Sequence, residues 1–346
     1  MLPLSTPAQP AGAPALTTIL LTGATGFVGG ALARRWASTG LSGGEQVAIR
    51  ALVRDPHRLA VRQLAALGAH LVPGDLRDPA ALAAACAGAD VVVHAAADML
   101  MTDRLTAWTV AVEGTRALYR AAAQAGVRRF IFISSLAVFA GTTGEVVESA
   151  PLVPSGDLYV DTKIAAEQTL HEEAAAPGAP ELTILRLAWV YGPGSANWTN
   201  KPIHAAQAGK LIIPGDGHLM FSYVYVDNAV DAVNAAIRAP HTGIYHIFDG
   251  STTYKEFMSA YCAMAGTRPR HLPLPMVQVL AAGNDLYARL TGRYTLLTPR
   301  TLRALSRKRP VSSSSGEKAV RELGWHPQIT LHEGMERIAR DFEAGA

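Results

Sequence analysis

Two side chains with complementary proton chemistry, Tyr159 and Lys163, lie four residues apart near the middle of the chain. The segment that contains them is rich in helix-forming residues, and a spacing of four places both on one face of a helix. An ammonium group beside a phenol favours the phenolate, lowers the pKa of the tyrosine and lets it exchange a proton with a substrate. The alternative is a surface pair, because this spacing often occurs by chance.

A pair of serines, Ser134 and Ser135, ends an apolar run at 130–134 that predicts a buried strand. The carboxyl ends of parallel strands are where open α/β sheets bind ligands, and a hydroxyl there can hydrogen-bond a reacting oxygen. Together with Tyr159 and Lys163, such a serine suits a hydride transfer in which the tyrosine acts as acid or base.

A glycine-rich turn near the N-terminus also predicts chemistry. Gly23, Gly26 and Gly29 follow a β-rich apolar run at 17–21 and precede a helix-prone segment. Glycines allow a tight turn and a close approach of the backbone to a pyrophosphate, and the helix that follows offers free N–H groups and the positive end of its dipole. Because the three glycines stand between a strand and a helix, we predict a bound dinucleotide rather than an ordinary turn.

The end of the second predicted strand, 47–53, distinguishes between the two nicotinamide cofactors. NAD sites usually place a carboxylate there for the ribose hydroxyls, whereas this chain has Arg54, with Arg50 shortly before it. A guanidinium pairs with a 2′-phosphate through charge-assisted hydrogen bonds, so we expect NADP(H) to be favoured over NAD(H). The alternative is that the neighbouring Asp55 accepts a hydrogen bond from a ribose hydroxyl, as in NAD sites. Asp75, after the third predicted strand, is a candidate acceptor for the adenine amino group.

These residues require a scaffold in which strands alternate with helices. Short apolar runs occur at 47–53, 70–72, 90–94, 130–134 and 182–187, and alanine-rich helical segments lie between them at 79–86, 104–125 and 159–173. The alternation predicts right-handed βαβ crossovers and an α/β fold with a doubly wound parallel sheet covered on both faces.

After Tyr191 the pattern changes to a mixed region interrupted by glycine and proline. The runs at 223–226 and 244–248 have the character of strands returning to the sheet, and Ser314 and Glu317 have the spacing of a helical capping box. The expected organisation is a disordered extension at 1–16, a nucleotide-binding domain of 17–190 plus 223–250, and a smaller mixed C-terminal substrate lobe of 191–222 plus 251–346.

Composition excludes several classes of protein. With 346 residues, 49% hydrophobic and 17% charged, the chain can bury a large core and is not disordered. Its net charge of +3, interpreted as spread along the sequence, predicts no nucleic-acid surface, and no apolar run of membrane-spanning length lacks a charge. Cys86 and Cys262 are too few for a disulfide framework, and His94 lacks a second ligand at metal-binding spacing, so no metal is expected. We predict a cytoplasmic protein that acts on a small molecule.

Taken together, the motifs resemble those of the extended short-chain dehydrogenases/reductases, in the NAD(P)-dependent epimerase/dehydratase superfamily. The resemblance runs from about residue 17 to 340 and rests on Thr22-Gly23-Ala24-Thr25-Gly26-Phe27-Val28-Gly29, Gly74-Asp75-Leu76, His94-Ala95-Ala96, Ile133-Ser134-Ser135, Tyr159-x-x-x-Lys163, Arg186-Leu187-x-x-Val190-Tyr191-Gly192-Pro193, Tyr225-Val226-Asp227-Asn228 and Leu323-Gly324-Trp325-x-Pro327. It implies a Rossmann fold with a small C-terminal substrate lobe.

The resemblance also implies roles for individual residues. The catalytic triad would be Ser135, Tyr159 and Lys163, with Ser135 preferred to Ser134 because the second serine of such a pair usually faces the substrate. Lys163 would also contact the nicotinamide ribose. Family members commonly form dimers through the two long helices, here 104–125 and 159–173, so we expect a homodimer. The residues implied in cofactor binding are Gly23, Thr25, Gly26, Phe27, Val28, Gly29, Arg54, Asp75, Leu76, Ala95, Ala96, Ala97, Tyr159, Lys163 and Val190.

Departures from the family pattern bear on the substrate. Sugar-nucleotide epimerases and dehydratases tend to carry an arginine just before the segment that matches 223–227, where this chain has Phe221 and Ser222. The stretch at 226–228 and the last hundred residues resemble the 3β-hydroxysteroid dehydrogenase branch instead.

Aromatic residues gather in sequence around the predicted lobe junction and form either the core of the lobe or an apolar substrate wall. We take Tyr191, Trp198 and Phe221, together with Ser135, as candidate substrate contacts.

The sequence therefore predicts an NAD(P)(H)-dependent ketone reductase or alcohol dehydrogenase for an apolar, steroid-like or 3-oxo substrate, with Tyr159 as the acid/base. One alternative is a sugar-nucleotide epimerase or dehydratase. An alternative of another class is a non-catalytic dinucleotide-sensing protein, which would not need Ser135, Tyr159 and Lys163.

Overall fold

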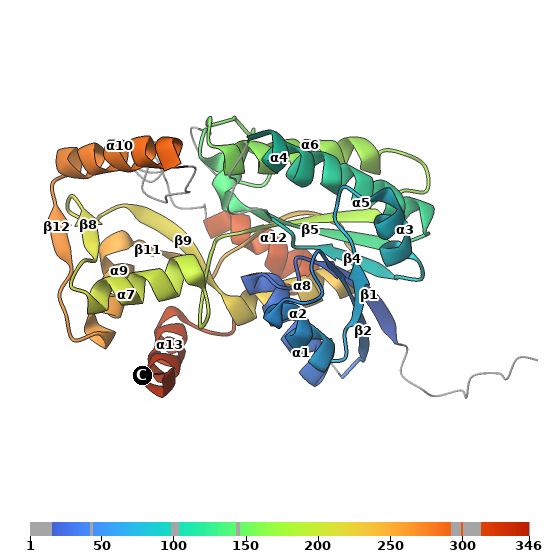
Figure 1. Cartoon of the computed structure of the whole chain (residues 1–346), viewed down its shortest axis with the longest axis horizontal. Coiled ribbons are helices and arrows are strands. Elements are labelled where there is room, and N and C mark those ends of the chain that lie inside the picture. The colour runs from blue at the N-terminus through green and yellow to red at the C-terminus, as the bar shows by residue number, and fades with distance from the viewer. Residues whose placement is uncertain are drawn as a thin grey trace, which may run out of the picture.

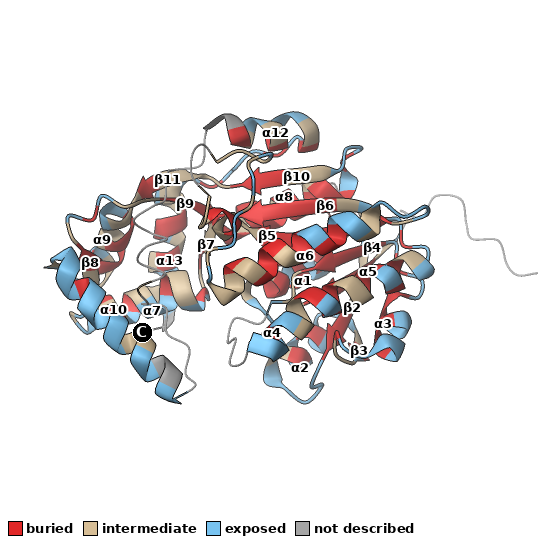
Figure 2. Ribbon diagram, turned by 90° about the horizontal axis from the view of Figure 1, so that it is seen from above, coloured by how far each residue is buried: buried red, intermediate tan, exposed pale blue. Residues whose placement is uncertain are grey.

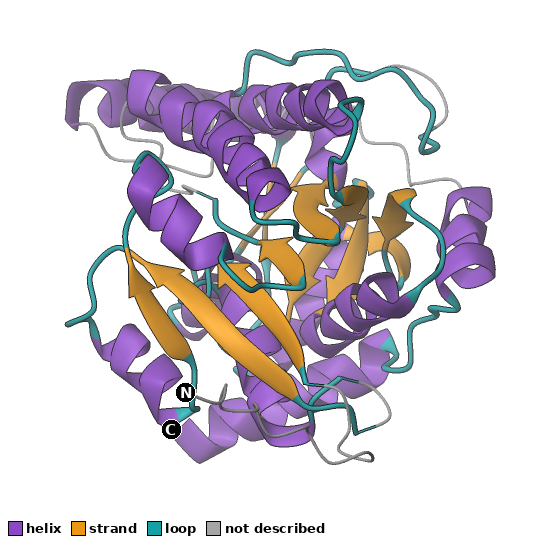
Figure 3. Cartoon of the chain, turned by 90° about the vertical axis from the view of Figure 1, so that its right-hand side faces the viewer, coloured by secondary structure: helices purple, strands orange, loops and turns teal. Residues whose placement is uncertain are grey.

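Seven parallel strands form the main sheet (Figures 1 and 3). The computed structural model describes residues 16–41, 44–97, 104–142, 146–291, 299 and 313–345, so the extension predicted at 1–16 lies almost entirely outside the described residues. In hydrogen-bonded order the strands are β10 (Gly243–Ile247), β6 (Glu181–Leu187), β5 (Arg129–Ser135), β4 (Val91–His94), β1 (Thr17–Thr22), β2 (Val47–Val53) and β3 (His70–Pro73). The order reverses between β1 and β4, and this switch point is where such sheets leave a crevice for a ligand.

Helices cover both faces of this sheet (Figure 1). One face carries α1 (Phe27–Thr39), α2 (Leu59–Ala66), α8 (Val226–Arg238) and α12 (Ser313–Leu323), and the other carries α3 (Pro79–Cys86), α5 (Gly114–Gln124) and α6 (Leu158–Ala174). Strand side chains alternate between the two cores: Ile19 and Leu21 face the first, whereas Leu20 faces the second. The predicted α/β, Rossmann-type class is therefore confirmed.

A smaller mixed lobe lies beside the main sheet. Its three-stranded sheet has β9 (Met220–Tyr225) between β7 (Trp189–Tyr191) and β11 (Gly250–Thr253), and β8 (Ile212–Pro214) pairs with β12 (Arg270–Leu272). The remaining helices are α7 (Lys201–Gln207), α9 (Tyr254–Met264), α10 (Leu274–Thr291) and α13 (Leu331–Gly345).

The prediction that a strand at 223–226 returns to the main sheet is wrong. That strand, β9, pairs in parallel with β7 and in antiparallel with β11. Its aromatic side chains pack against Tyr191 and Phe257 inside the lobe, and this packing decides the sheet to which it belongs. The strand expected at 244–248 does join the main sheet, as β10.

Two helices differ from the predicted outlines. The helix expected at 104–125 is divided into α4 (Arg104–Trp108), a π-helical turn η1 (Thr109–Glu113) and α5.

A capping box occurs at Thr253 and Glu256, at the start of α9, where we had not predicted one. Two short turns complete the described chain, η2 (Leu136–Phe139) and η3 (Ala196–Asn200). No helix within the described ranges is long and apolar enough to span a membrane.

Candidate active site

The first two turns of α6 hold Tyr159 and Lys163 against the end of β5. Asp157 caps this helix, because one carboxylate oxygen accepts hydrogen bonds from the backbone N–H groups of Tyr159 (3.0 Å) and Val160 (3.2 Å). The cap fixes the start of the helix, so the two side chains, four residues apart, share the face that packs on β5.

Lys163 is buried, with 7% of its surface exposed. Its Nζ donates a hydrogen bond to the carbonyl oxygen of Ile133 at 2.8 Å and lies 4.5 Å from the centre of the Phe132 ring. Burial lowers the pKa of Lys163 to about 8, although the nearby Glu167 carboxylate raises it in part. A cation held near its titration point can adjust its charge when a partner arrives.

Tyr159 is partly buried at the mouth of the same site, next to Ser135. Burial raises the pKa of the Tyr159 phenol, and a hydrogen bond with the Ser135 hydroxyl opposes that rise. The lowered pKa that we predicted for Tyr159 is therefore not found in this structure. The physical reason is that the Lys163 ammonium is directed to the Ile133 carbonyl, so it does not offset the cost of burying a phenolate.

The two serines at the end of β5 have different environments. Ser134 is buried, with 3% exposed, and donates to Oε1 of Glu167 at 2.5 Å. Ser135 is partly exposed, its Oγ accepts from the backbone N–H of Ala137 at 3.1 Å, and it lies close enough to the Tyr159 hydroxyl to influence the pKa of that phenol. Successive side chains of a strand point in opposite directions, so only Ser135 is available to a ligand beside Tyr159.

Below Lys163 lies a buried ion pair that we did not predict. The Arg186 guanidinium donates to both oxygens of Glu167, from Nε at 3.1 Å and from Nη2 at 2.6 Å, and both side chains are almost fully buried. Glu167 is one helical turn beyond Lys163, and Arg186 is a charged residue in the buried part of β6. A charge inside a buried strand needs a buried partner, and that signal could have identified the pair.

The glycine turn after β1 is closely packed. Gly23 has φ of +70°, and a Cβ there would lie 2.6 Å from the backbone of Ala95 and Ala96, which follow β4. A Cβ on Gly29 would lie 2.2 Å from the carbonyl oxygen of Gly23. Both positions therefore require glycine for steric reasons, and they bring the turn against the switch point between β1 and β4.

The N-terminus of α1, at the end of the same turn, has features that suit the binding of an anion. Gly26 caps the helix without a side-chain hydrogen bond, and the first turn contains no acidic residue. Thr25 and Gly26 are exposed, and Phe27 and Val28 are partly so. Free N–H groups and the positive helix end thus fit the pyrophosphate of a dinucleotide.

The two candidate arginines at β2, Arg50 and Arg54, have different partners. Arg54 is exposed directly after β2 and is close enough to Asp75 to help lower the pKa of that carboxyl, although the Arg77 side-chain hydrogen bond is the larger cause. Arg50 instead donates to the carbonyls of Ala84 (2.8 Å) and Ala87 (2.7 Å) at the end of α3. Arg50 is therefore a helix-capping residue, and Arg54 is the one that faces solvent at the site.

Five further predicted cofactor contacts differ in exposure. Leu76 is 7% exposed and belongs to the core, so only its backbone is available to a ligand. Ala95 and Ala96 are partly buried and Ala97 is exposed, directly after β4. Val190, in β7, is partly buried.

His94, which ends β4, is a structural residue. Its ring nitrogens pair with the hydroxyls of Thr22 (2.6 Å) and Thr115 (2.9 Å), and it is buried. Burial lowers the pKa of His94 to about 3, so the ring is neutral and connects β1, β4 and α5. Within the described residues, no group of three or more His, Cys, Asp or Glu side chains is placed to bind a metal.

The aromatic candidates divide into core and wall. Tyr191 is fully buried and Phe221 is 2% exposed, and both pack edge-on against Phe257. These two residues therefore belong to the core of the lobe, and our prediction that they contact substrate is not supported. Trp198 is partly exposed and stacks on Trp189 with ring centres 3.7 Å apart, so this pair remains the apolar surface nearest to the prediction.

A carboxylate that we did not predict lies just after β10. One oxygen of Asp249 accepts from the backbone N–H of Tyr225 at 2.6 Å, whereas Oδ1 is buried without a hydrogen-bond partner among the described residues. Burial raises the pKa of Asp249 to about 7. The hydroxyl of Tyr191 is likewise buried and unpaired in the described structure.

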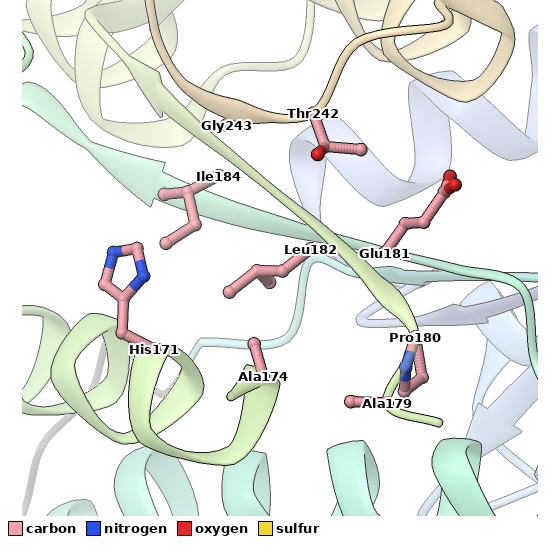
Figure 4. A pocket seen from close by; sticks show the side chains of 9 residues that line it. All are labelled: His171, Ala174, Ala179, Pro180, Glu181, Leu182, Ile184, Thr242 and Gly243. Atoms are coloured by element: carbon pink, nitrogen blue, oxygen red, sulfur yellow. The ribbon is translucent and has the colours of Figure 1, made fainter. Parts of the chain in front are cut away.

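Two cavities in the described structure are possible ligand sites. A small one of about 10 Å³ adjoins Tyr159 and Lys163 and is otherwise lined by Ala96, Ala97, Ala111, Thr115, Phe132 and Thr162. A larger one of about 400 Å³ lies between the end of α6 and the starts of β6 and β10, beside His171, Glu181 and Gly243 (Figure 4). That position is the amino edge of the sheet, whereas parallel sheets bind ligands at the carboxyl edge. The smaller cavity, which adjoins the candidate residues Tyr159 and Lys163, is therefore the better candidate for the site.

Comparison with known proteins agrees with this geometry. Residues 19–248 match the NAD dependent epimerase/dehydratase family, and the chain belongs to that family. It is thus an enzyme of a family that binds a nicotinamide dinucleotide, and 3β-hydroxysteroid dehydrogenases are among its relatives.

Two sequence relatives and one solved structure illustrate the range. The chain is 32% identical over 294 residues to 3beta-hydroxysteroid-dehydrogenase/decarboxylase isoform 1 of Arabidopsis thaliana, a match that covers 78% of this chain and 66% of that protein. It is 28% identical to the 4-hydroxy-2-methyl-3-oxo-4-farnesyl-3,4-dihydroquinoline-1-oxide ketoreductase of Stigmatella aurantiaca, over 94% of this chain and 96% of the relative. The dTDP-glucose 4,6-dehydratase DesIV of Streptomyces venezuelae, solved with NAD and TYD bound, superimposes with a TM-score of 0.73 at 22% identity, over 95% of this chain and 97% of the other, and this likeness concerns the fold. The chain spans just under two thirds of the Arabidopsis protein.

Proposed function

We propose that the chain is an NADP(H)-dependent ketone reductase or alcohol dehydrogenase for an apolar substrate. The observation that carries the proposal is the placement of Ser135 and Tyr159 next to each other and beside the buried Lys163, at the carboxyl edge of the sheet and next to the glycine turn. A reduced nicotinamide, when bound, supplies a hydride.

In the reductive direction, Ser135 and Tyr159 would hydrogen-bond and protonate the carbonyl oxygen of the substrate. The Ser135 hydroxyl donates a hydrogen bond to the carbonyl oxygen of the ketone and favours the negative charge that develops there. The Tyr159 phenol transfers its proton to the same oxygen, so that one hydride and one proton convert the ketone to the alcohol. The raised pKa of Tyr159 keeps the phenol protonated, which is the form a proton donor needs.

Lys163 and the α1 turn would hold the cofactor. Lys163 would donate to the nicotinamide ribose, and the turn from Gly23 to Gly29 would hold the pyrophosphate. Arg54 would pair with the 2′-phosphate of NADP(H). Asp55 is less suited to a ribose hydroxyl, because its carboxylate already accepts from the His57 N–H at 2.9 Å.

The apolar substrate is supported by a stretch of sequence without cationic side chains and by two relatives. The sequence has no lysine or arginine between Lys210 and Arg238, and Phe221 is buried where sugar-nucleotide enzymes tend to carry an arginine. The partly exposed Trp189–Trp198 stack offers an apolar surface instead. The relatives named above act, by their names, on a hydroxysteroid and on a farnesylated oxo compound.

The test is loss of the absorbance of the reduced nicotinamide with a panel of bulky cyclic, steroid-like and 3-oxoacyl ketones. The proposal expects substrate-dependent consumption of NADPH. No consumption with any ketone, together with epimerised or dehydrated product from a sugar nucleotide, would instead assign the alternative activity.

Cofactor choice has a separate test. Arg54→Ala should raise the KM for NADPH by tenfold or more and leave the KM for NADH nearly unchanged, because only NADPH carries the 2′-phosphate. Arg58→Ala is the matched control, since Arg58 is an exposed arginine of the same loop. Equal effects of the two substitutions would refute the assignment to Arg54.

Two further predictions concern the assembly and its place in the cell. We keep the expectation of a cytoplasmic homodimer formed through α4, α5 and α6, on the pattern of the family. Sedimentation equilibrium would test the dimer, and a monomer at micromolar concentration would contradict it.

A further inference from the structure

The helix α10 has an apolar face that the described structure does not cover. Of the fourteen large apolar side chains that are exposed in the described residues, seven belong to this helix. Figure 2 shows α10 exposed along most of its length, in contrast to α6, which is half buried.

The inner face of α10 packs on the small β8–β12 sheet. Val277 and Ala281, one turn apart, are almost fully buried against Ile212 and Leu272 of that sheet. Among the described residues, these two are the side chains of α10 that belong to a buried apolar cluster.

Six of these seven exposed apolar residues form a single stripe, and Leu274 at the start of the helix is the exception. At 3.6 residues per turn the six lie within about 120° of one another around the helix axis, on the side away from Val277 and Ala281. The stripe is about 21 Å long at 1.5 Å per residue. Its members and their exposed fractions are Met276 (54%), Val279 (72%), Leu280 (47%), Leu286 (59%), Tyr287 (48%) and Leu290 (77%).

The sequence around α10 is strongly basic. Between Arg268 and Arg309 there are nine arginine or lysine residues and one acidic residue, Asp285, so this stretch has a net charge of +8 in a chain whose total is +3. The remainder therefore carries −5, and the interpretation that charge is spread along the chain is corrected here. Arg268 and Arg270, which lead into the helix, are exposed.

We infer that α10 binds the surface of a bilayer that contains anionic lipids, lying in the plane of the membrane with its stripe among the acyl chains. An apolar helical face in a cationic stretch of chain is the combination that such interfaces select, and no spanning segment is required. A second copy of this chain is disfavoured as the occupant, because a two-fold contact through the stripe would bring the two cationic stretches together. A nucleic acid would use the arginines but has no need of the stripe.

The test is co-sedimentation of the full chain with vesicles of phosphatidylcholine containing phosphatidylglycerol. We expect binding that weakens in high salt and falls strongly on vesicles of phosphatidylcholine alone. The variant V279N/L286N/L290N should lower the partition constant by about 100-fold or more, since each buried leucine or valine side chain contributes about tenfold. The control variant L59N/V320N removes two exposed apolar side chains outside α10, and it should bind like the parent.

Circular dichroism and turnover of a water-soluble ketone would show that the variants are folded, and the binding result does not depend on the proposed activity. Vesicle binding that survives the α10 substitutions would overturn the inference and assign the attraction to charge alone. The stripe would be assigned to a second copy of the chain if the parent protein did not bind vesicles but formed dimers, and if the α10 variant lost those dimers.

Discussion

The two adjacent serines at the end of β5 allow the catalytic assignment to be separated from structural effects. The variants Ser134→Ala and Ser135→Ala remove the same atoms from neighbouring positions of one strand. In the structure, Ser134 bonds to the buried Glu167, whereas Ser135 lies close to the Tyr159 hydroxyl and accepts from the Ala137 N–H.

The contacts predict that Ser134→Ala mainly lowers stability and that Ser135→Ala mainly lowers the turnover number. Without Ser134 Oγ, the Glu167 carboxylate loses a hydrogen bond in a buried setting but keeps Arg186, so the free energy of unfolding should fall by about 1.5–3 kcal/mol. The turnover number should stay within about threefold. Without Ser135 Oγ, a donor to the developing oxyanion is lost, and kcat should fall about 10²–10³-fold, which is about 2.7–4 kcal/mol. The stability cost there is limited to a short turn, about 1 kcal/mol or less.

Urea unfolding followed by circular dichroism, with steady-state ketone reduction on the same preparations, measures both quantities. The reasoning predicts that the stability defect and the catalytic defect appear in different variants. It would be refuted if Ser134→Ala lowered kcat as much as Ser135→Ala, because then the serine that contacts the substrate would have been misassigned.

Three further outcomes follow from the contacts described. Asp157→Ala removes the cap that accepts from the Tyr159 and Val160 N–H groups and should cost about 1 kcal/mol of stability, measured by urea unfolding, whereas Asp157→Ser, which can still cap, should cost less. Gly29→Ala places a Cβ 2.2 Å from a backbone oxygen and should abolish NADPH binding by fluorescence titration. Gly30→Ala places its Cβ 3.3 Å from the end of the flexible Arg34 side chain and 3.5 Å from the Ala24 carbonyl oxygen, an ordinary contact, and should be tolerated. Burial raises the pKa of Asp249 to about 7, so the folded chain keeps a proton that the unfolded chain releases from about pH 4 upward. The free energy of unfolding should therefore fall as the pH rises from about 4 to about 7. Asp249→Asn should flatten that part of the pH profile, and an unchanged slope would show that Asp249 is not its source.

Local sequence signals were sufficient for the main sheet and the glycine turn. The strands of a parallel sheet are buried on both faces, so they are continuous apolar runs, and β2 occurs at the predicted residues, 47–53. The glycines at 23 and 29 were predicted from spacing, and the structure adds the packing reason, because each Cβ would meet backbone atoms. Ser135 was preferred to Ser134 by resemblance, and the burial of Ser134 against Glu167 supplies a physical argument for that preference.

The errors occurred where tertiary packing overrides local pattern. The strand at 220–225 looks the same in sequence whether it joins the main sheet or a small one, and its aromatic contacts in the lobe decide. The direction of the Lys163 ammonium depends on the Ile133 carbonyl, a contact across thirty residues that spacing along one helix does not reveal. Tyr191 and Phe221 were ambiguous between core and wall, because an aromatic side chain suits both until its burial is known.

The central claim is that Tyr159 transfers the proton during reduction of an apolar ketone, and Tyr159→Phe tests it most directly. The substitution removes one hydroxyl from a partly buried ring. With the best ketone of the panel, kcat should fall by about 10²–10⁴-fold, while the dissociation constant for NADPH changes less than about threefold. If Tyr159→Phe kept its turnover number within a few-fold of the parent while still binding NADPH, the assignment of Tyr159 as the acid would be contradicted.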